Sequence, residues 1–125
     1  MKKSVMKQWV KALRSGKYKQ TRGQLRGKRG YCCLGVLCDV YDADAWNKSP
    51  VFDSYSTPYS FGPMKECYSL PPKVLAWSDL KSDVAVVKWL QGRNGDDVCL
   101  ASINDSWHWG FKKLAAFIEK NYRKL

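Results

Sequence analysis

CCLGVLCDVY, residues 32–41, is the stretch around which the rest of this chain has to pack. Cys33, Val36, Leu37 and Val40 recur at helical spacing, and the segment has no charge before Asp39, so it predicts a buried helix. A glycine inside a helix costs about 1 kcal/mol relative to alanine. Gly35 therefore indicates close packing of this helix against another backbone.

The segment before it predicts a second helix, amphipathic, from near Ser4 as N-cap to Ser15, with Gly16 as its stop. Its apolar stripe contains Met6, Trp9, Val10 and Leu13. A cationic stripe lies about 90° round the same helix and contains Lys3, Lys7, Lys11 and Arg14.

Residues 17–31, KYKQTRGQLRGKRGY, join these two helices. Lys17 to Thr21 predicts a short strand. Three glycines then punctuate a basic loop whose only sizeable apolar residue is Leu25.

Residues 43–70 predict an irregular insert with one hairpin, because all five prolines lie between Pro50 and Pro72. Its aromatic residues are expected to pack on the body of the protein: Trp46, Phe52, Tyr55, Tyr59, Phe61 and Tyr68. Pro71 and Pro72 suit the first turn of a short helix through Val74 and Trp77.

The last third of the chain predicts a hairpin and a helix. Two β-rich runs, Asp83 to Gln91 and Val98 to Ile103, flank an Asn-Gly turn and predict an antiparallel hairpin near 83–103. Asn104 to Ser106 predict a turn, and residues 107–123 a C-terminal amphipathic helix. The predicted fold class is α+β, with about four helices around a small antiparallel sheet in a single domain, residues 1–125.

Several classes of protein are excluded by the sequence. No apolar run of the 125 residues approaches the roughly 18 needed to span a bilayer. Lys7, Lys11 and Arg14 interrupt what would be the apolar core of a signal peptide. A cytoplasmic protein without membrane contact is therefore expected, with its five cysteines as free thiols.

The charge is uneven along the chain. There are 22 basic and 11 acidic residues, a net charge of +11. Residues 1–31 hold 11 basic residues and no acid, whereas residues 32–125 hold 11 of each. The sequence thus places the whole net charge on the first quarter of the molecule, the basic segment 1–31, and indicates an anionic partner.

Two blocks carry a family resemblance: WVKALRSGKYKQ-x-x-G-x-L from Trp9 to Leu25, and GYCCLGVLCD from Gly30 to Asp39. With Asn104, Asp105 and the helical pattern from Phe111 to Glu119, they resemble a family of small uncharacterised proteins of tailed bacteriophages and prophages. Members often have a glycine soon after the Asn-Asp, whereas Trp107, His108 and Trp109 intervene here before Gly110. The resemblance implies a phage protein in the host bacterial cytoplasm and no particular chemistry.

The leading hypothesis is a non-enzymatic protein that binds a phosphate-bearing ligand without a cofactor. Cations and glycines lead into the start of the 32–41 helix, where free backbone N–H groups would suit a phosphate, and Tyr18 and Tyr31 would stack on a base. The candidate ligand-binding residues are Lys7, Lys11, Arg14, Lys17, Tyr18, Lys19, Gln20, Arg22, Arg26, Lys28, Arg29 and Tyr31. The ligand is either nucleic acid or a nucleotide signal of host defence, the latter bound in an oligomer.

Two other function classes stay open. One is an inhibitor that contacts a host bacterial enzyme directly. The other is a small enzyme, with a Cys32 or Cys33 thiolate beside His108 or a metal on Asp39, Asp42 and Asp44. Packed thiols and turn-forming acids are the simpler interpretation. A zinc site using Cys33, Cys38 and Cys67 or Cys99 is a further alternative that the spacing does not favour.

Overall fold

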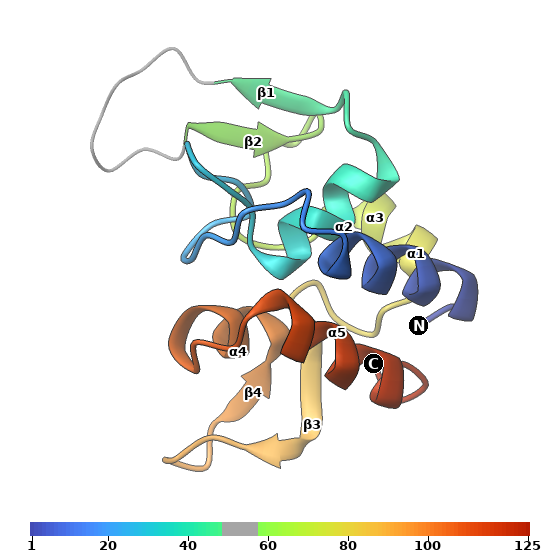
Figure 1. Ribbon diagram of the computed structural model, residues 1–125, viewed down its shortest axis with the longest axis vertical. Helices are drawn as coiled ribbons and strands as arrows, with labels where there is room; N and C mark the ends of the chain where they lie inside the picture. Colours follow the sequence, from blue (N-terminus) through green and yellow to red (C-terminus); the bar gives the residue numbers. More distant parts are fainter. Residues whose placement is uncertain (49–57) are drawn as a thin grey trace.

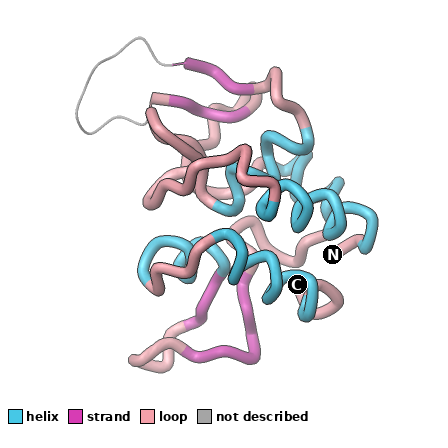
Figure 2. The backbone as a smooth tube through the Cα atoms, viewed as in Figure 1, coloured by secondary structure: helices cyan, strands magenta, loops and turns pink. Residues whose placement is uncertain are grey.

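The computed structural model describes residues 1–48 and 58–125. Within them lie five helices and two separate two-stranded antiparallel sheets, a mixed α+β fold (Figures 1 and 2). The elements are α1 (Lys3–Arg14), α2 (Cys33–Tyr41), β1 (Trp46–Lys48), β2 (Tyr59–Phe61), α3 (Pro72–Ser78), β3 (Val86–Gln91), β4 (Asp97–Cys99), α4 (Leu100–Ser106) and α5 (Phe111–Asn121). The two sheets correct the prediction of one, and α4 is a helix that the sequence pattern did not indicate.

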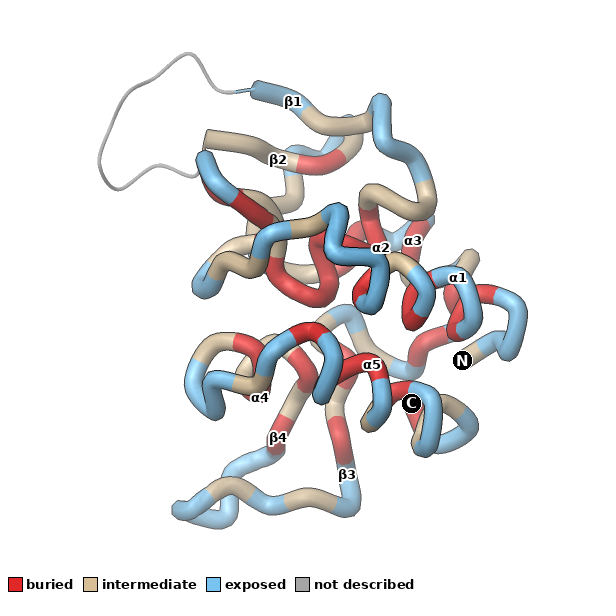
Figure 3. Tube along the Cα trace, in the orientation of Figure 1, coloured by how far each residue is buried: buried red, intermediate tan, exposed pale blue. Residues whose placement is uncertain are grey.

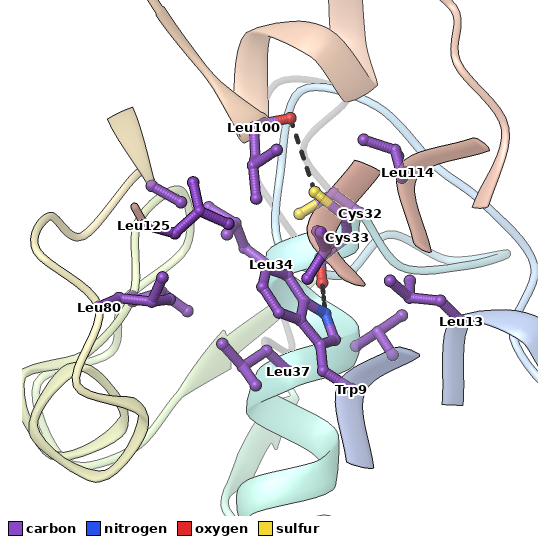
Figure 4. Close-up of a cluster of buried hydrophobic side chains, with 14 of the residues drawn as sticks. Trp9, Leu13, Cys32, Cys33, Leu34, Leu37, Leu80, Leu100, Leu114 and Leu125 are labelled. Carbon is purple, nitrogen blue, oxygen red and sulfur yellow. Dashed lines mark hydrogen bonds between the residues drawn. The ribbon is translucent and has the colours of Figure 1, made fainter. Parts of the chain in front are cut away.

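Helix α2 is the buried centre, as its spacing predicts, and every residue from Cys33 to Cys38 is buried (Figure 3). The indole N–H of Trp9 donates to the Cys33 carbonyl at 2.8 Å, which ties α1 to α2 (Figure 4). The close approach expected at Gly35 is confirmed, because a Cβ there would collide with the Leu25 backbone. Since no larger residue fits, this glycine fixes how the 17–31 segment crosses the helix.

Helices α1 and α5 lie side by side and run in opposite directions (Figure 1). Each buries an apolar stripe and exposes a polar one, the α1 stripe being the one predicted. Helix α1 begins at Lys3, one residue before the predicted Ser4 cap. Its N-cap residue is Lys2, which makes no side-chain capping bond. Gly16, two residues after the end of α1, has a φ of +74°, in the left-handed region.

The hairpin near 83–103 is confirmed in part. Strands β3 and β4 pair antiparallel with a register shift between Val86 and Gln91, but β4 ends at Cys99. The expected strand to Ile103 and the turn at Asn104 are wrong, since both residues lie in α4. Cys99 and Ser102 form a reciprocal capping box that starts this helix directly after the strand.

The 43–70 insert holds one hairpin, β1 with β2, as expected. Trp46 and Phe61 pack edge to face at 4.8 Å, whereas Tyr68 is 63% exposed and corrects the expectation that it packs. Phe52 and Tyr55 lie outside the described residues. The helix expected after Pro71 is α3, with Pro71 as its N-cap residue.

The short strand expected from Lys17 to Thr21 is wrong. The described backbone makes only single bridges there, Gln20 with Tyr31 and Arg26 with Tyr31. The loop closes on itself through the Tyr31 N–H, which donates to the Lys19 carbonyl at 2.8 Å. No helix among the described residues combines the length and the apolar character that crossing a membrane requires.

Candidate functional site

The positive charge is not confined to residues 1–31 but extends over α5. Residues 107–125 contain five basic residues and one acid, a net charge of +4, and residues 32–106 contain six basic and ten acidic residues, −4. The equal numbers of basic and acidic residues from 32 to 125 therefore come from two segments of opposite net charge. Because α5 lies beside α1, the fold brings the two basic segments next to each other. The basic residues of α5 and its C-terminal extension are Lys112, Lys113, Lys120, Arg123 and Lys124.

A groove of about 420 Å³ runs between α1 and α5. Met6 and Val10 form its apolar floor and are each only 5% exposed. The predicted cationic stripe of α1 forms one wall, and its four side chains are exposed. The complete lining is Lys3, Met6, Lys7, Val10, Lys11, Arg14, Glu119 and Tyr122.

Among the residues that the structure describes, Glu119 is the one acid that faces this stripe. Arg14 Nη1 pairs with Glu119 Oε2 at 2.5 Å, with both side chains about half exposed. Within residues 1–48 and 58–125, Lys3, Lys7 and Lys11 have no carboxylate partner. Three lysines are therefore available to an anion from solution.

The charge around Tyr122 also reflects this surface. Its hydroxyl accepts a hydrogen bond from Arg123 Nε at 3.2 Å, which lowers the pKa of the phenol. The charge on Arg123 and those on Lys3 and Lys7 lower it further. The C-terminal end of α5 and the start of α1 thus share one positive field.

The predicted residues of 17–31 divide into five exposed cations and four residues, Tyr18, Gln20, Arg26 and Tyr31, that pack or bond within the protein. The Tyr18 hydroxyl donates to Asp39 Oδ2 at 2.6 Å. Burial raises the pKa of Tyr18, and the bond to Asp39 raises it further. Gln20 Nε2 donates to Asn104 Oδ1 at 2.8 Å and to the Trp109 carbonyl at 2.9 Å.

Arg26 lies in a cluster of aromatic rings. Its guanidinium is 3.9 Å from the ring centroid of Tyr59, 5.0 Å from that of Tyr31 and 5.4 Å from that of Trp46. Such contacts hold a guanidinium on the protein. Tyr31 in turn packs edge to face on Tyr18 at 5.1 Å. Neither tyrosine presents the free stacking face that the sequence suggests, and the exposed cations of the segment are Lys17, Lys19, Arg22, Lys28 and Arg29.

The start of α2, where a phosphate was expected, is buried and already bonded. The Cys33 N–H donates to Asn104 Oδ1 at 3.2 Å, and the Gly35 N–H donates to Cys32 Sγ at 3.3 Å. Asn104 is fully buried, and its amide also donates to the Thr21 carbonyl at 3.0 Å and to Asp105 Oδ1 at 2.7 Å. This asparagine uses its whole hydrogen-bonding capacity and fills the place that a phosphate would need.

The thiols of Cys32 and Cys33 are packed in the core, as expected from the interpretation of these cysteines as buried apolar residues. Burial raises the pKa of Cys32 to about 12 and that of Cys33 well above its usual range. Cys33 Sγ lies 3.6 Å from the Leu100 carbonyl. Protonated thiols in the core are poor nucleophiles. In the described part of the chain, no three His, Cys, Asp or Glu side chains gather as a metal site would require.

Sequence reasoning missed two things. The anchoring role of Asn104 carries no local signal, since three of its four partners, Gln20, Thr21 and Cys33, lie more than 70 residues away in sequence. The basic residues of α5 could have been found by counting charge in shorter windows.

Comparison with known proteins gives one finding. No curated protein and no solved structure matches the chain. A family model described as a domain of unknown function (DUF8296) matches residues 1–122, so the chain belongs to this family.

Proposed function

We propose that the protein binds nucleic acid through the phosphate backbone, in the groove between α1 and α5. The observation that carries the proposal is the exposed row of Lys3, Lys7, Lys11 and Arg14, which faces one acid, Glu119, among the described residues. Contacts of lysine and arginine with phosphates supply most of the sequence-independent affinity for nucleic acids.

The geometry of the row favours a polymer over a small nucleotide. Lys3 to Arg14 span about 16 Å along the helix, the length of about five successive phosphates of one strand. A small nucleotide would instead need charges that converge on one point. The 17–31 loop was expected to supply that convergence, but Tyr18, Gln20 and Arg26 are bonded within the protein.

The biological setting stays a prediction from sequence. The sequence predicts a bacteriophage accessory protein that acts without catalysis in the host bacterial cytoplasm. A homo-oligomer is part of the same prediction. Inhibition of a host enzyme by direct contact would use the same cationic surface on an acidic protein.

The test is a fluorescence anisotropy titration of a labelled 20-base-pair duplex at about 50 mM salt. We expect Lys7→Gln with Lys11→Gln to weaken binding about tenfold or more, because two phosphates lose their partners. The matched control is Lys73→Gln with Lys88→Gln, two exposed lysines on α3 and β3. Absence of binding by the natural protein, or an equal loss in both double variants, would overturn the proposal.

A further inference from the structure

A second groove, larger than the first, lies at the other end of α5. Its volume is about 1090 Å³, and it is formed by the β3–β4 turn and the connection between α4 and α5. Both segments lie on the same side of the molecule (Figure 1). Trp107, His108 and Trp109 form one wall, and Arg93, Asp96 and Asp97 contribute from the turn. The α1–α5 groove and this second groove share no lining residue.

The two tryptophans of this groove differ in how firmly they are held. Trp109 packs on Phe117 at 5.7 Å, and its carbonyl accepts from Gln20 Nε2. Trp107 meets Trp109 edge to face at 5.9 Å but is 38% exposed. His108 between them has a φ of +55°, in the left-handed region, which turns the chain sharply there. The result is a fixed indole that supports a second, accessible one.

The charge of the second groove is opposite to that of the first. Arg93 is outnumbered by Asp96 and Asp97, so these three side chains carry a net charge of −1. A phosphate would be repelled here, whereas a flat, uncharged ring with hydrogen-bonding edges would suit it. Lys112 and Lys113 are exposed on the first turn of α5, and Lys113 Nζ lies beside the groove, 4.1 Å from the Trp109 ring centroid. Cations for the flanking phosphates are thus available next to an acidic, aromatic groove.

We propose that this groove takes an unpaired nucleobase, stacked on Trp107, from a single-stranded nucleic acid whose phosphates contact the lysines of α5. The proposal rests on the proposed function, since it adds base contacts to the same basic surface. A base inside a duplex is stacked on both faces and cannot enter such a groove. Single strands of DNA and RNA share the required chemistry, because every base has a π face.

The experiment compares Trp107→Ala with Tyr68→Ala, a control at an exposed aromatic ring that lies outside the groove. Anisotropy at about 50 mM salt is measured with a labelled 20-nucleotide DNA strand, the same sequence in RNA, and the matching DNA duplex. We expect Trp107→Ala to weaken single-strand binding about tenfold and to leave duplex binding unchanged, because one stacking contact is lost. Tyr68→Ala is expected to change neither. Loss with RNA alone or DNA alone would identify which strand the groove selects.

A second variant separates lost stacking from lost folding. Trp107→Leu keeps apolar volume but has no flat ring, so the same tenfold loss with an unchanged melting temperature supports the proposal. Equal single-strand affinity in the natural protein and both Trp107 variants would overturn the proposed base contact. Duplex binding in the same experiment would still support the proposed function. No binding to any of the three probes would overturn both.

Discussion

Helix α1 and the 17–31 loop are neighbours in sequence and carry four and six basic residues, yet the fold uses them differently. In α1, Met6, Trp9 and Val10 face the core, so the lysines one quarter-turn away must face water. In the loop, Gln20 and Arg26 are turned inward by Asn104 and by an aromatic cluster. Net charge therefore locates a basic region, but packing decides which of its side chains face solvent.

The largest effect is expected where the loop is anchored to the core. Asn104→Ala leaves Gln20, the Thr21 carbonyl and the Cys33 N–H without their buried partner, and should cost about 3 kcal/mol of unfolding free energy. We expect a melting temperature lower by roughly 10 °C. Asn94→Ala, at an exposed turn, is the control and should melt like the natural protein. Equal melting of the two variants would contradict a structural role for this loop.

Arg26 offers the next test of the same contrast. Arg26→Ala removes a half-buried guanidinium from three rings and should cost about 1 to 2 kcal/mol in urea denaturation. Arg22→Ala, four residues earlier and exposed, should change stability by less than about 0.5 kcal/mol. If Arg26→Ala instead leaves stability intact and abolishes nucleic-acid binding, the loop is the binding surface and α1 is not.

How much of this could be predicted from sequence depends on the range of the interactions. The burial of α2, the close approach at Gly35 and the stripe of α1 are local patterns of spacing and side-chain size, and the structure confirms them. The loop could not be predicted, because Gln20 meets its partner Asn104 across 84 residues. The predicted binding residues on α1 line a groove, but the other wall comes from α5, about 100 residues away in sequence.

Alkaline pH should reveal the burial of Tyr18. Its pKa is raised in the folded protein, so the folded state keeps a proton that the unfolded chain releases near its ordinary value of 10. Stability contributed by Tyr18 is thus present below about pH 10 and is lost as the pH rises above it, by about 1.4 kcal/mol per pH unit for one proton. Tyr18→Phe should flatten the fall of the urea midpoint between pH 9 and 11.

Tyr68→Phe is the control for that titration, since Tyr68 is 63% exposed and should leave the alkaline profile unchanged. Identical profiles for the Tyr18 and Tyr68 variants would show that the Tyr18 hydroxyl is as accessible as an exposed one. The Tyr18 side chain in the loop would then face solvent, as the lysines of α1 do.

The smallest change in stability is expected in the α1–α5 groove itself. Glu119→Gln breaks an exposed ion pair with Arg14, which contributes less than about 1 kcal/mol. The same change removes the acid that faces the stripe and frees Arg14, so duplex affinity should rise severalfold in anisotropy titrations. Weaker binding after this substitution would place the phosphates elsewhere.

The salt dependence of duplex binding tests the central claim most directly. If Lys3, Lys7 and Lys11 each contact a phosphate while Arg14 stays paired with Glu119, the plot of log affinity against log salt has a slope of about −2.7. Lys7→Gln with Lys11→Gln should reduce its magnitude by about 1.8, whereas Arg22→Gln with Arg29→Gln in the loop should reduce it by less than about 0.5. An unchanged slope in the α1 variant, or the full reduction in the loop variant, would contradict the account.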